Sequence, residues 1–170
     1  MIAILLALWA ASPPGTPSSV SQTPDTALNR QIGIPLATLR DSLFAVQGSG
    51  AAFRRDLAAA SPDLVIARAR RVQESCTSAL ATAAATRRAL AATTLPPRSG
   101  PRATDLQRTL SMLQADLARC QRDFDPGTRY TRVDSLRAWG PSRLILIDAS
   151  VRRAVHASDQ LRAVLGYKPT

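Results

Sequence analysis

Lysine, glutamate and histidine each occur only once among the 170 residues. Zinc and di-iron sites need several His, Cys or Glu ligands at helical spacing, and a chain with only His156 and Glu74 gives them little support. Asp159 follows His156 by three residues and could act as a second ligand, but a surface histidine beside Arg152 and Arg153 is the simpler interpretation. We therefore predict no metal site and no cofactor.

Catalytic motifs are equally scarce. The chain has no G-x-S-x-G and no phosphate-binding P-loop, and its two cysteines, Cys76 and Cys120, form neither C-x-x-C nor C-x-x-C-H. A Ser/His/Asp set could use only His156. We predict a non-catalytic protein and assign no catalytic residue, with an enzyme of unknown chemistry left as an alternative.

Glycine and aromatic residues are few, with 8 and 7 respectively, and runs of β-branched residues are almost absent. Alanine, the strongest helix former, is abundant. A chain of this length can bury a real core as one domain. The composition therefore predicts an all-α domain, and the patterns below favour an up-and-down bundle of about four helices.

No apolar run is long enough to cross a bilayer, which needs about 20 residues. The longest run, residues 2–11, resembles the apolar core of a secretory signal, although it lacks a basic segment before it and a small-x-small cleavage pattern. We interpret residues 1–11 as a signal peptide of a periplasmic or secreted protein. The alternative is a disordered or interfacial N-terminus.

The next segment is rich in proline and serine and poor in apolar residues. We expect residues 12–34 to form a flexible linker, in which a short helix could begin at Thr23-Pro24 and end at Gly33-Ile34-Pro35. The bundle domain then spans residues 35–170.

Residues 62–124 have the pattern of an antiparallel helical hairpin that folds back at residues 95–101. Apolar and small residues recur at alternating steps of three and four in both arms. The first arm carries them at Val65, Ala69, Val72, Cys76, Ala79, Ala83, Thr86 and Leu90. The second arm carries them at Ala103, Leu106, Leu110, Leu113, Leu117, Cys120 and Phe124. One register brings the two series face to face and places Cys76 opposite Cys120.

The matched level of the two sulfurs, together with the export-like N-terminus, predicts a disulfide between Cys76 and Cys120. The alternative is a pair of buried free thiols. The bridge would close a loop of 45 residues, counting both ends. On the chain-entropy model, a disulfide that closes a loop of this length stabilises the fold by about 4 kcal/mol at most.

A helix before this hairpin carries the same pattern from Leu36 to Leu57, and the pattern continues in phase through Gly48-Ser49-Gly50. We expect a continuous or kinked helix there, the alternative being two pieces separated at the glycines. Ser61-Pro62 has the residue types of an N-cap and a first helical position, and folding there allows this helix to pack antiparallel on the hairpin. A sharp kink in place of a turn is the alternative.

After a turn that begins at Asp125, we expect a short helix over residues 133–139, an interruption at Gly140-Pro141-Ser142 and a last helix over residues 142–165. Ile145 and Leu146 would widen the buried face of the last helix. Gly166 is well placed to end it as a C-cap.

The basic residues are 21 arginines and one lysine, and the net charge is +10. Many arginines have an aspartate or glutamate three or four residues away, as in Asp105–Arg108, which is typical of solvated helix faces. Residues 75–104 contain no acid and form the uncompensated end of the hairpin. The candidate anion-binding residues at this end are Arg87, Arg88, Arg98 and Arg102.

Two functions from different classes fit this composition. We predict a non-catalytic, exported helical-bundle protein of the cell envelope that acts through protein interaction. The alternative is a module that binds anionic ligands or a membrane surface through the basic hairpin end. Nucleic acid is a poorer candidate, since no aromatic residue is interleaved with these arginines. A solvated basic surface without a ligand remains the simplest alternative.

Overall fold

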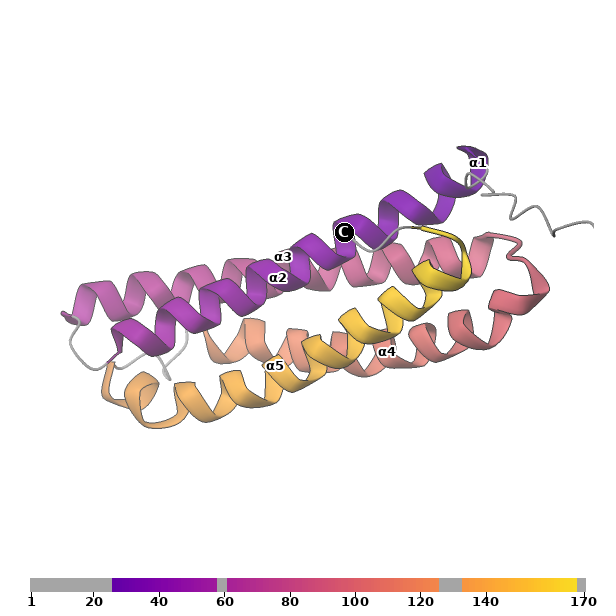
Figure 1. Cartoon of the computed structure of the whole chain (residues 1–170). Coiled ribbons are helices and arrows are strands. Elements are labelled where there is room, and N and C mark those ends of the chain that lie inside the picture. Colours follow the sequence, from indigo (N-terminus) through magenta and orange to yellow (C-terminus); the bar gives the residue numbers. More distant parts are fainter. Residues whose placement is uncertain (1–25, 58–60, 126–132, 168–170) are drawn as a thin grey trace, which may run out of the picture.

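The computed structural model describes residues 26–57, 61–125 and 133–167, which are helical over nearly their whole length (Figure 1). Its four long helices are α2 (Ile34–Asp56), α3 (Pro62–Ala92), α4 (Gly100–Asp123) and α5 (Val133–Val164). Each helix packs against the next one along the chain, and α5 closes the bundle against α2. The protein is therefore an all-α, up-and-down bundle, as predicted. The expected signal peptide, residues 1–11, and most of the linker lie outside the described residues.

The core consists of the stripes that the sequence predicted. On α3, all eight positions from Val65 to Leu90 are buried, and on α4 so are the six from Ala103 to Cys120. On α2, every predicted position is buried except Leu57, which is half-buried. Burial of these apolar side chains is the dominant favourable contribution to the fold.

The hairpin register is also confirmed. Cys76 and Cys120 form a disulfide with their Cα atoms 6.2 Å apart, and both residues are buried. Helix α2 runs unbroken through Gly48 and Gly50, and Gly50 packs against Leu144 of α5. The glycine therefore allows close approach of two helices instead of breaking one.

Helix α3 begins as its sequence indicated. The side chain of Ser61 accepts a hydrogen bond from the backbone N–H of Leu64 at 3.4 Å, and Pro62 occupies the first helical position. An N-cap of this kind stabilises a helix by about 1 kcal/mol. The chain therefore turns before α3, which packs antiparallel on α2, and the alternative of a kinked single helix is wrong.

The helix end expected at Gly33-Ile34-Pro35 is wrong. A short α1 (Thr26–Leu28) passes through a π-helical turn, η1 (Asn29–Gly33), directly into α2. The N–H of Ile34 bonds to the carbonyl of Asn29, five residues back, and this wider turn precedes Pro35, which has no N–H to donate. Ile32 is completely buried. The packed part of the chain thus begins before residue 35.

The interruption expected at Gly140-Pro141-Ser142 is also wrong, because α5 continues through Pro141. An interior proline costs a helix about 3 kcal/mol. Opposing this cost, Leu136 on one side of the proline and Leu144 on the other are both buried. Gly140 lies between them on the same stripe, so close to the ring of Phe53 that an added Cβ would be 2.8 Å from it.

Aromatic rings reinforce this end of the bundle. Phe124 makes edge-on contacts with Phe53 of α2 and Trp139 of α5, each with ring centroids 5.4 Å apart. Edge-on aromatic pairs contribute about 0.5–1.5 kcal/mol beyond the area they bury. The rings therefore link α2, the end of α4 and the first turns of α5, where the proline would otherwise favour a break.

The last helix ends as predicted. Gly166 has a φ of 82°, its N–H bonds to Ala163, and the N–H of Tyr167 bonds to Arg162, which is the Schellman pattern. This end places the ring of Tyr167 against Gly33. Ile145 and Leu146, expected to widen the buried face, are instead about 60% exposed.

Candidate functional site

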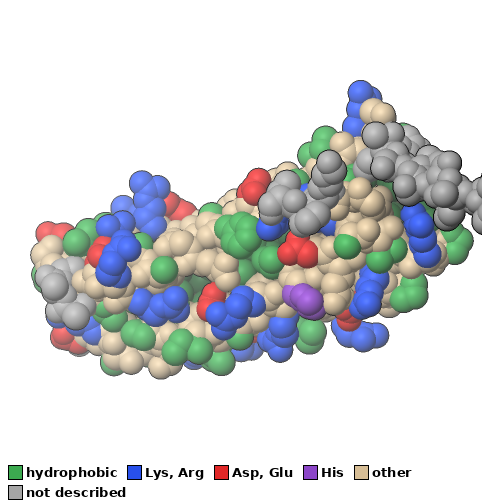
Figure 2. Space-filling view, in the orientation of Figure 1, with side chains coloured by type: hydrophobic (Ala, Val, Ile, Leu, Met, Phe, Trp, Pro, Cys, Tyr) green, Lys and Arg blue, Asp and Glu red, His purple; other side chains and the backbone are tan. Residues whose placement is uncertain are grey.

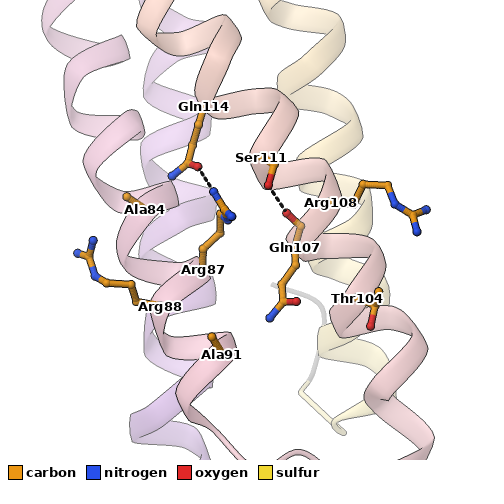
Figure 3. A pocket seen from close by; sticks show the side chains of 9 residues that line it. All are labelled: Ala84, Arg87, Arg88, Ala91, Thr104, Gln107, Arg108, Ser111 and Gln114. Carbon is orange, nitrogen blue, oxygen red and sulfur yellow. Dashed lines mark hydrogen bonds between the residues drawn. The ribbon is translucent and has the colours of Figure 1, made fainter.

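A groove lies on the outer edge of the α3–α4 hairpin, on the side of the disulfide nearer the turn. It has a volume of about 650 Å³. The lining residues are Ala84, Arg87, Arg88, Ala91, Thr104, Gln107, Arg108, Ser111 and Gln114 (Figure 3). Three of the nine are arginines and none is acidic, so the groove combines positive charge with a concave surface.

Local sequence explains the shape. Ala84 and Ala91 leave room between the two helices, because they lie about two turns apart on one side of α3 and have only a methyl group each. At the end of the groove, the chain reverses through η2 (Pro97–Ser99), where Ser99 donates both its N–H and its hydroxyl to the carbonyl of Pro96. Ser99 is buried, and the turn is thereby fixed.

The three arginines differ in their surroundings. Arg87 crosses toward α4 and donates a hydrogen bond to the Oε1 of Gln114 at 2.5 Å. Arg88 and Arg108 lie on opposite sides of the groove and point away from each other (Figure 3). Within the described residues, neither side chain makes a hydrogen bond or an ion pair. An amide partner such as Gln114 orients Arg87 without neutralising its charge.

Polar groups between the arginines can also donate. The oxygen of the Gln114 amide accepts the hydrogen bond from Arg87, and its NH₂ group makes no hydrogen bond among the described residues. The hydroxyls of Thr104 and Ser111, in contrast, already donate to the carbonyls of Gly100 and Gln107 in their own helix. The donors open to a ligand are therefore guanidinium and amide groups, which suit carboxylate or phosphate oxygens.

The four arginines predicted from the sequence do not form one cluster. Arg87 and Arg88 line the groove, whereas Arg98 lies exposed in the turn. Arg102 donates to Gln160 of α5 at 2.8 Å and thus faces the other neighbour of α4. The role of all four in anion binding stays a prediction.

The sequence pattern does not identify Arg108 as a groove residue, because its spacing from Asp105 predicts a local ion pair. No ion pair joins Asp105 and Arg108 within the described residues. The register that joins the two cysteines contained the missing signal, since it also places Arg88 at the level of Arg108. The surroundings of Arg108 are therefore set by the facing arm of the hairpin and not by the nearest acid on its own helix.

Three ion pairs within the described residues join different helices. Arg68 of α3 contacts Asp56 at 2.7 Å, Arg143 of α5 contacts Asp123 at 3.5 Å, and Arg40 of α2 contacts Asp159 at 3.8 Å. Within single helices, Arg152 contacts Asp148 at 2.6 Å and Arg71 contacts Glu74 at 3.3 Å. Basic side chains recur along the visible face, with acidic ones among them (Figure 2).

His156 is exposed and shares a 2.7 Å hydrogen bond with Gln160. Asp159, the candidate second ligand, is turned toward Arg40. Among the described residues, no group of three or more His, Cys, Asp or Glu side chains is arranged to hold a metal ion. None of the described helices is long and apolar enough to span a membrane.

Comparison with protein-family models, with curated proteins and with solved structures finds no match to this chain. The case for any function therefore depends on the geometry of the groove and on the chemistry of its side chains.

Proposed function

We propose that the protein is a non-catalytic, exported interaction protein that binds anionic groups of its partner in the α3–α4 groove. The observation that carries this proposal is the set of three arginines around one concave surface, none of which has a carboxylate partner among the described residues. Guanidinium groups bind carboxylate and phosphate oxygens through paired hydrogen bonds, and several around one groove reinforce one another. The net charge of +10 attracts an anionic partner from a distance.

The compartment is part of the same proposal. A disulfide is characteristic of oxidising compartments, and Cys76 and Cys120 are joined in this fold. The apolar run at residues 2–11 resembles the apolar core of an export signal. We accordingly place the protein in the periplasm, at the cell envelope or in the secreted fraction. Cell fractionation tests this placement, and recovery of the chain only from the cytosol, with alkylatable thiols, would contradict it.

Binding of labelled poly-L-glutamate to the full chain, measured across a salt series, tests the proposed function. We expect binding at low salt that weakens steadily as salt rises, because the screening length falls from about 10 Å at 0.1 M to about 3 Å at 1 M. The groove variant, with Arg88→Gln and Arg108→Gln, should bind about tenfold more weakly than the native chain.

A matched control separates the groove from net charge. Arg70 of α3 and Arg122 of α4 are exposed and lie outside the groove, and their side chains make no hydrogen bond or ion pair among the described residues. Arg70→Gln combined with Arg122→Gln lowers the net charge by the same amount as the groove variant. If both double variants lose binding equally, attraction is diffuse and the groove is not the site.

A further inference from the structure

A second groove lies on the other side of α3, between α3 and α2, with a volume of about 420 Å³. Its lining is apolar or small in character and contains no charged residue; it includes Ile34, Ala81 and Ala85. Ile34 is 55% exposed at its edge. The cationic groove draws on residues 84–91 of α3 and the apolar groove on residues 81–86, so the two overlap along the helix axis.

The surface of α3 between the two grooves carries mostly small side chains and therefore protrudes little. By helical spacing, the exposed residues there are Ala81, Ala85, Ala92 and Arg88, and only the flexible arginine has a long side chain. A partner can therefore approach the backbone of α3 closely and reach into both grooves. Shape and charge together define one surface that is apolar on the α2 side and cationic on the α4 side.

We propose that this surface binds an acidic, amphipathic α-helix of a partner protein, which identifies the anionic partner of the proposed function. The partner's acidic side would face Arg88 and Arg108, and its apolar side would face the groove beside Ile34. The two grooves together extend over residues 81–91 of α3, a length of about 16 Å at 1.5 Å per residue, which matches about three turns of a helix.

A helix fits this surface better than an extended peptide does. Extended peptides gain affinity mainly by adding main-chain hydrogen bonds to the edge of a sheet, whereas the helices α2, α3 and α4 satisfy their own main-chain groups internally. An incoming helix brings its own hydrogen bonds and needs only side-chain complementarity. A lipid bilayer fits less well, because a flat surface cannot enter the two concave grooves.

Labelled peptides of about 16 residues, measured by fluorescence anisotropy against the full chain, test the proposal. The first is an amphipathic Glu/Leu helix, the second has the same composition in scrambled order, and the third replaces Glu with Lys. We expect the amphipathic acidic peptide to bind at least about tenfold more tightly than the scrambled one, because only it presents both faces at once. The Lys peptide should not bind.

Two variants separate the apolar contact from the charge. Ala81→Gln with Ala85→Gln raises the low surface of α3 without changing charge, and we expect about tenfold weaker binding of the amphipathic peptide. The control, Ala67→Gln with Ala115→Gln, makes the same change at exposed positions outside both grooves and should leave binding unchanged. Circular dichroism and thermal unfolding confirm that both double variants fold.

The outcomes distinguish this inference from the proposed function. Equal binding of the scrambled peptide, or full binding by Ala81→Gln/Ala85→Gln, would overturn the helix proposal while leaving anion binding in the groove intact. Binding to phosphatidylglycerol vesicles without binding to the acidic peptide would also overturn it, in favour of a lipid surface. If Arg88→Gln/Arg108→Gln binds poly-L-glutamate as tightly as the native chain does, the proposed function itself is overturned.

Discussion

The two ends of the bundle differ in the partners that arginine side chains contact on neighbouring helices. At the end that holds the α2–α3 and α4–α5 connections, Arg68 and Arg143 contact the carboxylates of Asp56 and Asp123 on neighbouring helices. At the hairpin end, the cross-helix partners of Arg87 and Arg102 are the amides of Gln114 and Gln160. A carboxylate neutralises the arginine, whereas an amide orients it and leaves its charge.

Not every arginine at the first end is paired, because the side chains of Arg70 and Arg122 there make no hydrogen bond or ion pair among the described residues. Paired charges between helices belong to packing, and their positive charge is not available to a ligand. Amide-held or unpartnered arginines keep their positive potential at the surface. One ion pair, Arg40–Asp159 at 3.8 Å, lies toward the hairpin end, but it joins α2 and α5 on the opposite side of the bundle from the α3–α4 groove.

The largest expected effect comes from the covalent link between the two hairpin arms. Replacing both Cys76 and Cys120 with alanine should lower the free energy of unfolding by about 4 kcal/mol, because the unfolded chain regains the freedom of a long loop. Urea unfolding followed by circular dichroism measures this loss. A loss below about 1 kcal/mol would show that helix packing alone holds the hairpin in register.

A pair of glycine variants tests packing near the aromatic end. Gly140→Ala would place a Cβ 2.8 Å from the ring of Phe53, which is held between its neighbours, and should cost about 1–2 kcal/mol. Gly48→Ala has open space around it and should instead stabilise α2 by about 0.5–1 kcal/mol. Thermal unfolding of the two variants gives the comparison, and equal shifts of the same sign would contradict it.

A smaller effect is expected from the carboxylate of Asp56 at the packed end. Asp56→Asn should cost about 0.5–1 kcal/mol, since it removes the charge that Arg68 contacts at 2.7 Å and Arg55 at 3.4 Å, and all three side chains are partly exposed. The loss should shrink at high salt. Chemical unfolding at low and high salt measures both quantities, and a loss that salt does not change would mean that the contact acts through packing.

The smallest effect on stability is expected at the groove. Arg88→Gln with Arg108→Gln removes no hydrogen bond or ion pair within the described residues, so the free energy of unfolding should change by less than about 0.5 kcal/mol. The same variant should lose binding. A substantial loss of stability would indicate that these arginines serve the fold and would weaken their assignment to a ligand.

Periodicity predicted the helices and most of the core, because apolar residues spaced three and four apart fall on one face of a helix, and that face is buried. It also predicted the register of the cysteines, since a single turn fixes which positions face each other. Local rules for glycine and proline failed at Pro35 and Pro141. At both places the buried stripe continues through the proline, at Ile32 and Leu36 and at Leu136 and Leu144, and tertiary burial outweighs the local cost.

The groove was only half predictable. Arg87 and Arg88 were identified from the absence of acid around them in the sequence. Arg108 and Gln114 were not, because the relevant neighbours lie on another helix and their contacts depend on how far the two arms separate. Charge pairing across helices, as at Arg68–Asp56, depends on the distances between packed helices, and the sequence alone does not give these distances.

Backbone amide chemical shifts of the ¹⁵N-labelled protein, recorded while the acidic amphipathic peptide is added, test the central claim most directly. The account predicts shifts concentrated in residues 81–92 of α3 and 104–114 of α4, with residues 62–72 of α3 unchanged. Shifts centred on the ion-paired end around Arg68 and Arg143, or spread evenly over every exposed arginine, would contradict it.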